Sequence, residues 1–341
     1  MIKILIGLLA TVFMQLFLLH NAVANTRSVE AVQEIGIAVN NIHKSTRQYQ
    51  QIMGVSKWEY QDLYNADGDK KYPSVRLARA QFGDKRIALI QPLAGPSLVK
   101  SHLEKHGPSI FHIGIKGEND ALAVYPSHSV TDGIGAKAKW IDTYADFGVN
   151  IFSYDPNTAL TSWGSTGNNK TPTVTDDNQL FQLGIVSRDL AKTAMSYFEQ
   201  LGIGPWLVVD FKGEHITNAQ YLGAKGAVKP HIKVAYAMWG NLQLELLMPI
   251  SGPSPHRDFL ITRGFGAHHV SYGPIKNHDA VVRALTEKGI AIQMQSDNGG
   301  EGRTATYMDT LDQLGFVLEL TRPFKGAGTL PIAGTIPARV Q

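Results

Sequence analysis

An internal repeat constrains this chain more than any other feature, because two copies of one sequence pattern imply two copies of one fold. Three stretches of the first half return in the second half in the same order, at offsets of 148, 157 and 167 residues: Glu34-Ile-Gly-Ile-Ala-Val with Gln182-Leu-Gly-Ile-Val-Ser, Ile110-Phe-His-Ile-Gly-Ile with Ala267-His-His-Val-Ser-Tyr, and Trp140-Ile-Asp-Thr with Tyr307-Met-Asp-Thr. We therefore predict a duplicated architecture with two equivalent halves.

Each half divides again into two units, in which a β-rich run is followed by a helical stretch and three more β-rich runs. Ser187–Leu201 has the spacing of apolar residues typical of an amphipathic helix, and Gly202 is placed to end it. The runs Leu207–Phe211, Ile232–Met238 and Leu242–Met248 have the composition of strands. The pattern predicts an α+β fold built from tandem βαβββ modules, two in each half.

These patterns, together with shifts in composition, divide the chain into five segments. They are a signal peptide at 1–24, a first domain at 25–156, a linker at 157–178, a second domain at 179–325 and a tail at 326–341. The linker is polar and rich in Thr, Asn and Gly. The tail is rich in Gly and Pro, and we expect it to lie over the surface or to be loose.

The first residues have the pattern of an export signal. Lys3 precedes the apolar run Ile4–Leu19, and Ala22-Val-Ala24 has the small-x-small pattern at which signal peptidase cleaves. We expect cleavage after Ala24 and a periplasmic or secreted protein, and an uncleaved N-terminal anchor is the alternative. The run of 16 residues is short for a full membrane span. The chain has no cysteine, which excludes a disulfide framework and a lipoprotein anchor.

Charge and composition bound the class of partner. The formal net charge of +3 is small for 341 residues and its basic residues are scattered, which argues against a nucleic-acid partner. No segment after the signal peptide is apolar enough to suggest a membrane partner. A small-molecule substrate is the expected partner, and the sequence leaves homodimer formation open.

The order of the modules and several phrases resemble the vicinal oxygen chelate superfamily, which includes glyoxalase I, methylmalonyl-CoA epimerase, extradiol dioxygenases, and fosfomycin and bleomycin resistance proteins. The phrases are Leu183-Gly-Ile-Val, Leu201-Gly-Ile-Gly-Pro-Trp206 and Gly315-Phe-Val-Leu-Glu-Leu320. The resemblance spans about residues 30–325. It implies that paired modules in each half curl a sheet around a cavity. Metal ligands then project inward from the first and last strand of each module.

The resemblance implies one metal site in the second half, with four ligands: Gln182, Glu245, His269 and Glu319. This set is similar to that of zinc-type glyoxalase I. Glu245 and Glu319 each lie alone in an apolar β run, where an unpaired carboxylate is costly to bury. Three oxygen donors and one nitrogen donor suit one divalent ion, either Zn or Ni, Co, Mn or Fe.

The first half serves as an internal control. The equivalent residues are Glu34, Ala88, His112 and Phe152. Two of these four have no donor atom, so the resemblance implies a degenerate site in which Phe152 fills the place of an ion. In the second half, His268 is expected on the opposite face from His269, because successive side chains of a strand alternate.

The ligand set implies a reaction in which the ion chelates adjacent substrate oxygens and stabilises an enolate, while a carboxylate removes the proton α to a carbonyl. Glu319 is the expected ligand and base, with Glu245 as second choice. This makes isomerase, epimerase or lyase chemistry the leading hypothesis. Residues that could shape the pocket are Trp206, Tyr221, Tyr236, Trp239, His256 and Arg257, although Trp206 matches Trp58 in the repeat and is expected in the core.

Three other functions stay open at this point. An extradiol ring-cleaving dioxygenase uses two histidines and one carboxylate on Fe(II), and Gln182 stands where its first histidine belongs. A binding or resistance protein would sequester a small molecule without turning it over. A purely structural pair of modules would hold no ion.

Overall fold

The computed structural model describes residues 31–67, 71–132, 136–154, 179–222, 224–225, 228–299, 302, 304–323 and 330–338. The predicted signal peptide at 1–24 and the predicted linker at 157–178 lie outside these residues. Among the helices that the structure describes, none combines the length and apolar character needed to span a membrane.

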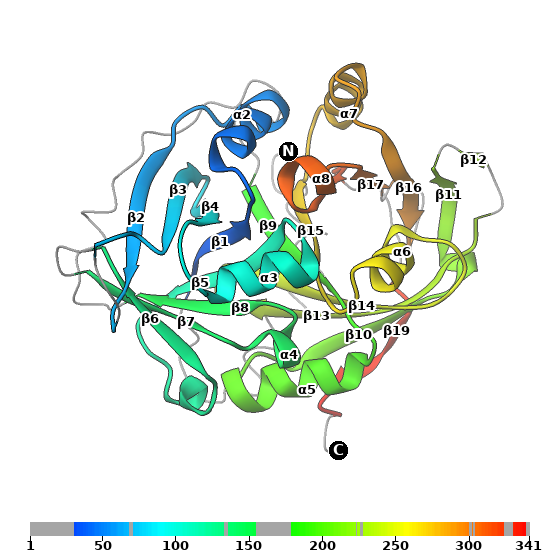
Figure 1. Cartoon of the computed structure of the whole chain (residues 1–341). Helices are drawn as coiled ribbons and strands as arrows, with labels where there is room; N and C mark the ends of the chain where they lie inside the picture. The colour runs from blue at the N-terminus through cyan, green and yellow to red at the C-terminus, as the bar shows by residue number, and fades with distance from the viewer. Residues whose placement is uncertain are drawn as a thin grey trace, which may run out of the picture.

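The first half folds into a closed barrel of eight strands, the blue to green part of Figure 1. Its elements are β1 (Val32–Ala38), α2 (Ile42–Met53), β2 (Glu59–Asn65), β3 (Val75–Phe82), β4 (Lys85–Pro92), α3 (Leu98–His106), β5 (Ser109–Lys116), η1 (Asp120–Val124), β6 (Ser127–Thr131), β7 (Lys137–Ile141), α4 (Tyr144–Phe147) and β8 (Asn150–Tyr154). Around the barrel the strands follow the order β1-β4-β3-β2-β6-β7-β8-β5. The strand β1 is parallel to β4 and antiparallel to β5, so the first strands of the two modules are neighbours.

The second half forms an eleven-stranded sheet. Its elements are β9 (Gln179–Val186), α5 (Leu190–Leu201), β10 (Trp206–Phe211), η3 (Gly213–His215), β11 (Ile216–Tyr221), β12 (Ala224–Lys225), β13 (His231–Trp239), β14 (Leu242–Ser251), α6 (Pro255–Thr262), β15 (Gly266–Gly273), α7 (His278–Glu287), β16 (Ile292–Asn298), β17 (Thr304–Met308), α8 (Leu311–Leu314), β18 (Val317–Thr321) and β19 (Ile332–Ile336). The strand order is β12-β11-β16-β17-β18-β15-β9-β14-β13-β10-β19. The strand β9 is parallel to β14 and antiparallel to β15, which repeats the arrangement of β1, β4 and β5.

The α+β class and the duplicated modules predicted from the sequence are confirmed. The predicted helix after Ser187 is α5, which begins one residue after Asp189 because that side chain accepts a hydrogen bond from the backbone N–H of Lys192. It ends at Gly202, whose φ of 71° lies in the left-handed region that glycine adopts without strain. The helix α2 has the same caps, Asn41 and Gly54. The repeat thus reproduces the helix ends as well as the strands.

Two features of the modules were not anticipated. The second module of the first half has only the five-residue 3₁₀ helix η1 where the pattern predicted a full helix. In addition, α3 and α6 connect the two modules within each half, just before β5 and β15. Both connecting helices begin after a serine, Ser97 or Ser254, whose side chain accepts a hydrogen bond from the third backbone N–H that follows it.

The two halves pack against each other through equivalent contacts. The hydroxyl of Tyr49 in α2 donates a hydrogen bond to the carbonyl oxygen of Leu314, at 2.7 Å. The hydroxyl of Tyr197 in α5 donates to the carbonyl oxygen of Phe147, at 2.9 Å. Each tyrosine therefore satisfies a carbonyl at the end of a short helix of the other half, α8 or α4, whose last carbonyls have no partner within the helix. One cluster of buried apolar residues includes side chains from both halves, so they share a core.

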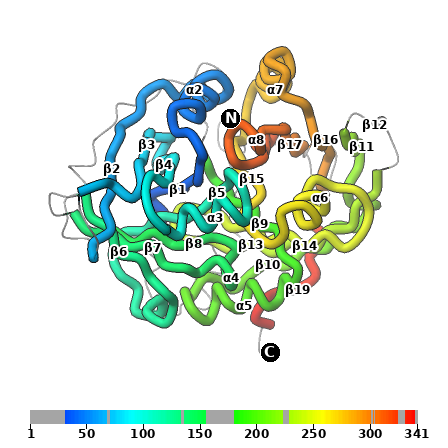
Figure 2. The backbone as a smooth tube through the Cα atoms, in the orientation of Figure 1, coloured from blue at the N-terminus to red at the C-terminus, as the bar shows by residue number. Residues whose placement is uncertain are grey.

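Part of the C-terminal tail belongs to the second sheet. Residues 330–338 are described, and among them β19 pairs antiparallel with β10, from Trp206 opposite Ile336 to Val209 opposite Ile332. Figure 2 shows this red segment running beside β10 close to the C-terminus. These residues form an edge strand with exposed or half-buried side chains, so they lie at the surface and are held there by backbone pairing. Backbone groups at a sheet edge need partners, and the tail supplies them to β10.

We expect the reciprocal tyrosine contacts to stabilise the pairing of the halves. Tyr49→Phe and Tyr197→Phe each keep the ring but leave a carbonyl unsatisfied, so each should lower the free energy of unfolding by about 1–3 kcal/mol. Chemical denaturation followed by fluorescence measures this. Tyr60→Phe, at an exposed position, is the matched control and should leave stability unchanged. A loss no larger than that of the control would show that the contacts do not hold the halves together.

Candidate metal centre

Four adjacent strands of the second sheet bring the four predicted ligands together. Gln182 on β9 lies opposite Ser271 on β15, and Ser271 lies opposite Glu319 on β18. On the other side of β9, Glu245 on β14 lies opposite Gly184. Four residues that are far apart in the sequence therefore occupy neighbouring positions on one patch of sheet.

The ligand atoms converge. One ligand atom from each of Glu245, His269 and Glu319 lies within 4.8 Å of the other two. The imidazole Nε2 of His269 is 3.0 Å from Glu245 Oε2 and 3.3 Å from Glu319 Oε2. All three residues are buried, with at most 6% of their surface exposed. Spacings of this size are compatible with ligands that share one ion at bond lengths of about 2.0–2.2 Å.

Gln182 joins this group through Ser271. The hydroxyl of Ser271 lies 2.7 Å from Gln182 Oε1 and also contacts Glu319 Oε2. The amide nitrogen of Gln182 donates to Gln243 Oε1 at 2.8 Å, so the amide oxygen is the atom on the side of Ser271 and Glu319. A hydroxyl has one proton and can donate it to only one of its two neighbours. Gln182 thus presents an oxygen to the site, as a ligand would.

This group has two acidic side chains and one histidine, so it has an excess of negative charge that favours binding of a cation. Burial raises the pKa of Glu319, and the negative charge of Glu245 raises it further, against the lowering effect of His269 and of hydrogen bonds from Ser271 and Tyr307. Burial alone would lower the pKa of His269, but the two carboxylates outweigh it and the pKa is raised. Both shifts mean that the site binds positive charge, in this case protons, to offset two buried carboxylates.

A missing side chain makes room for the histidine. A Cβ atom built on Gly184 would lie only 2.0 Å from Cε1 of His269, so the imidazole occupies the space above this glycine. The first half repeats the arrangement, with the ring of His112 over Gly36 at 2.2 Å. The glycine within the repeated phrase at each first strand is therefore a requirement of the site, because any larger residue would displace the imidazole.

The equivalent site of the first half contains a cation of the protein's own. The guanidinium of Arg79 on β3 lies 2.7 Å from the carboxylate of Glu34, and both are almost fully buried. The imidazole of His112 lies 3.2 Å from the same carboxylate and accepts a hydrogen bond from Trp140. Burial would raise the pKa of Glu34, but Arg79, His112 and Arg86 together hold it far below its usual range. This buried acid is already neutralised.

Phe152 lies beside His112 as expected, with ring centroids 5.0 Å apart, and stacks on Trp140 at 4.7 Å. Sequence reasoning nevertheless missed Arg79, which supplies the positive charge. Its position in the repeat is that of Tyr236, so the second half has no arginine there. The signal that could have revealed it is the alternation of the strand, which puts Arg79 on the same face as the apolar residues Val75 and Leu77.

The expectation that His268 points to the opposite face from His269 is wrong. Pairing between β15 and β9 shifts register between Ala267 and His269, so His268 is the extra residue of a β-bulge. A bulge interrupts the alternation of side chains and re-aims them. As a result Nδ1 of His268 lies 3.0 Å from Nδ1 of His269. Of the residues named as pocket-shaping, Trp206 and Trp239 are buried in the core, and His256 packs against these two histidines.

Comparison with known proteins agrees with the architecture. A variant of 4-hydroxymandelate synthase from Streptomyces coelicolor superposes with a TM-score of 0.57, over 89% of this chain and 95% of that one, at 13% identity. A hypothetical protein, BH1468, from Bacillus halodurans C-125 covers 45% of this chain and all of its own, at 21% identity and a TM-score of 0.32. The first of these shows a shared fold, and the second is too distant to carry an argument.

At the sequence level one relative matches a stretch about as long as one domain of this chain. The uncharacterized protein YqjC of Bacillus subtilis (strain 168) is 23% identical over 132 residues, which are 38% of this chain and 94% of that protein. The sequence model of the Glyoxalase/Bleomycin resistance protein/Dioxygenase superfamily matches residues 33–131 and again 181–307, so that more than half of the chain is covered. The second match ends before Glu319, whose place in the site rests on the geometry above. The chain belongs to the glyoxalase, bleomycin resistance protein and dioxygenase superfamily.

Proposed function

We propose that the second half holds one divalent metal ion and that the protein is an isomerase, epimerase or lyase acting on a small, α-oxygenated carbonyl compound. The observation that carries this proposal is a comparison between the halves. In the first half one buried acid is neutralised by Arg79. In the second half the arginine is replaced by Tyr236 and Glu34 by Gln182. Two acids, Glu245 and Glu319, stand where the first half has Ala88 and Phe152. Two buried carboxylates then need a cation from outside the chain.

The donor set fits such an ion. Glu245, Glu319 and Gln182 offer oxygens and His269 offers Nε2, a mixture that suits zinc and other divalent first-row ions. When bound, the ion would act as a Lewis acid that polarises a substrate carbonyl. The neutral imidazole and the amide add no charge, so two carboxylates match the charge of one divalent cation.

Glu319 is the residue that we assign to proton transfer. Its pKa is raised, first by burial and then by Glu245, which makes its carboxylate a better proton acceptor than an exposed glutamate. The hydroxyls of Ser271 and Tyr307 hydrogen-bond to it and hold it in place. Removal of a proton α to a carbonyl and its return at the same or the adjacent carbon is isomerisation or epimerisation. Glu245, which faces the same His269 nitrogen, is the alternative base.

The donors around Nε2 of His269 favour this chemistry over oxygenation. Non-haem Fe(II) dioxygenases hold their ion with two histidines and one carboxylate, whereas here one histidine is accompanied by two carboxylates and an amide. The likeness to 4-hydroxymandelate synthase is one of fold alone. Export, which rests on residues 1–24 and stays a prediction, would favour substrates other than thioesters of coenzyme A and glutathione adducts.

Metal binding should depend on both glutamates. Glu245→Ala and Glu319→Phe install the residues that the first half carries at these positions, so the fold should accept them. Loss of a partner that only supports a ligand weakens metal affinity about 10–100-fold, and loss of a ligand itself should cost at least about 100-fold. Metal analysis after dialysis against zinc measures this. Glu287→Ala, at an exposed glutamate of α7, is the control, and unchanged metal content in both site variants would refute the assignment.

The close approach of Gly184 to His269 gives a steric test. Gly184→Ala should displace the imidazole and lower zinc affinity by at least about 10-fold, because ligand position controls metal affinity. Gly36→Ala creates the same clash with His112 in the first half and is the matched control. It should lower thermal stability to a similar extent and leave zinc binding intact. Equal loss of zinc in both variants would indicate general unfolding instead of a local effect.

Proton transfer is tested by exchange with solvent deuterium. The zinc-loaded protein should catalyse exchange of the α proton in at least one of a panel of α-hydroxy and α-keto carbonyl compounds, followed by NMR. Glu319→Gln keeps an oxygen donor but removes the base, and it should reduce exchange about 10²–10⁴-fold. A panel in which the loaded wild-type protein binds compounds but exchanges none would identify it as a binding protein.

A further inference from the structure

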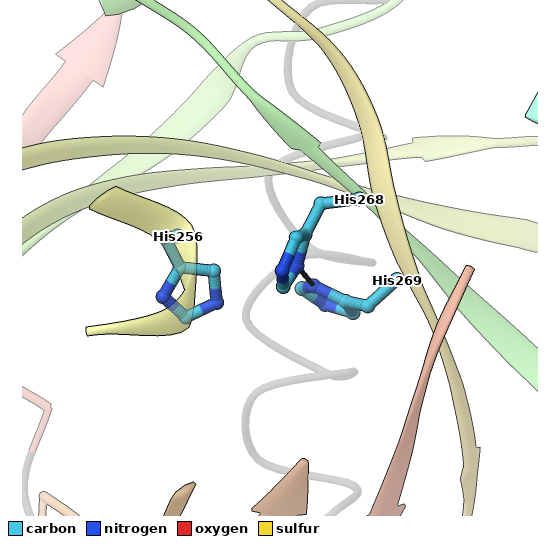
Figure 3. A group of neighbouring side chains, drawn as sticks. All are labelled: His256, His268 and His269. Carbon is cyan, nitrogen blue, oxygen red and sulfur yellow. Dashed lines mark hydrogen bonds between the residues drawn. The ribbon is translucent and has the colours of Figure 1, made fainter. Parts of the chain in front are cut away.

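Three buried histidines lie next to the carboxylates, and two of them, His256 and His268, have no role in the proposed chemistry. We call this group the histidine cluster: His256 on α6, and His268 and His269 on β15. One ring nitrogen from each lies within 4.8 Å of the other two. Figure 3 shows His256 reaching from α6 toward the pair on β15, whose Nδ1 atoms are 3.0 Å apart. All three are at most 2% exposed.

Local structure fixes the positions of all three rings. Ser254 caps α6, which places His256 in the first turn, and the ring of His256 lies 4.9 Å from that of His268 and 5.7 Å from that of His269. The bulge in β15 turns His268 to the side of His269. Gly184 leaves room for the ring of His269. The cluster is therefore held by a capped helix, a bulge and a glycine, and none of these depends on a flexible loop.

The buried ring of His256 lacks hydrogen-bond partners within the described part of the chain. Neither of its ring nitrogens has a hydrogen-bond partner among the residues that the structure describes, although the ring is buried. Burial of a polar group without a partner is costly, and native proteins rarely retain it without compensation. A ligand placed among the three rings would supply what is missing.

The ring of His269 can serve two sites at once, because its two nitrogens face different groups. Its Nε2 faces Glu245 and Glu319, at 3.0 and 3.3 Å. Its Nδ1 faces His268 at 3.0 Å, on the side of the histidine cluster. We call the proposed metal site of Gln182, Glu245, His269 and Glu319 the carboxylate site. The carboxylate site and the histidine cluster therefore require different nitrogen atoms of His269 and do not compete for the same one.

The first half again acts as a control. Val99 and Phe111 occupy the positions of His256 and His268, and the equivalent of His269 is His112. Both apolar residues are fully buried, so valine and phenylalanine pack well at these positions of the fold. The second half replaces them with two histidines, which are harder to bury. The two halves therefore differ at these positions in nitrogen atoms that can bind a ligand. Packing alone does not require this difference.

We propose that His256, His268 and Nδ1 of His269 form a second metal site, which takes a zinc-like ion with a preference for nitrogen ligands. Three imidazoles and one open position make a tetrahedral environment typical of zinc. Metal ions bind the neutral form of an imidazole. Binding at Nδ1 of His269 displaces the proton of that ring to solvent. When the carboxylate site is also filled, the ring would lose its second proton to solvent as well and would bridge the two ions as an imidazolate.

A simpler role for His268 accounts for less of the structure. A metal-bound histidine often donates its second ring N–H to a nearby acceptor, and Nδ1 of His268 could accept that proton from His269. That role would explain one contact but not the two unpartnered nitrogens of His256, nor the replacement of Val99 and Phe111 together. The second ion accounts for all three rings.

The test uses two pairs of substitutions that borrow residues from the first half. Glu245→Ala with Glu319→Phe removes the carboxylate site, and His256→Val with His268→Phe removes the proposed second site. Each protein is loaded with Zn²⁺, dialysed and assayed for zinc per chain. We expect two ions in the wild-type protein, one in each double variant and none when all four substitutions are combined. His128→Val, at an exposed histidine, should not change these values.

The outcomes separate this inference from the proposed function, although both sites share His269. One ion that is lost with the glutamates and unaffected by His256→Val and His268→Phe would overturn the second site and leave the first. One ion with the opposite dependence would overturn the first site and support the second. Cu²⁺ bound to the Glu245→Ala, Glu319→Phe protein provides a readout on a protein with an intact cluster. Its electron paramagnetic resonance spectrum should show three nitrogen ligands, and a spectrum without nitrogen couplings would reject the proposal.

Discussion

The burial of carboxylates beside a histidine is the interaction on which both halves of this molecule depend. A buried acid has to be paired or protonated, and the two halves meet this requirement differently. In the first half the guanidinium of Arg79 on β3 forms an ion pair with Glu34, so the negative charge is neutralised by a residue of the chain itself. In the second half Tyr236 replaces the arginine, and the buried acids are two others, Glu245 and Glu319. One scaffold therefore produced an ion pair in one half and, as we propose, a site for an external cation in the other.

The scaffold supports both outcomes because the geometry around the imidazole is repeated in the two halves. Gly36 and Gly184 leave the same space for an imidazole, and the same register shift occurs in the strand pairs β1–β5 and β9–β15. The reciprocal hydrogen bonds of Tyr49 and Tyr197 then join the halves. Stability comes from these repeated features and from the shared apolar core, so the side chains of the site are free to differ.

Much of the fold and the four residues of the carboxylate site could be predicted from the sequence. The resemblance to the vicinal oxygen chelate superfamily implied Gln182, Glu245, His269 and Glu319 as ligands, at the first and last strands of the modules that the repeat defines. Alternation failed at His268, because a bulge adds one residue to a strand without a recognisable sequence signal. It also could not show that Arg79 pairs with Glu34, since the two are 45 residues apart and meet only through the order of strands in the barrel.

The sequence by itself determined the duplication, the βαβββ modules and the identity of the acidic residues in apolar strands, because each of these is a periodic or local pattern. Tertiary structure alone decided which side chains meet. It brought His256 from a connecting helix to His268 and His269, paired the tail strand β19 with β10, and turned the two nitrogens of one imidazole toward different groups. The physical reason is that contacts across a curved sheet depend on register, bulges and helix packing. These are set by the whole core and are not encoded in any short stretch of residues.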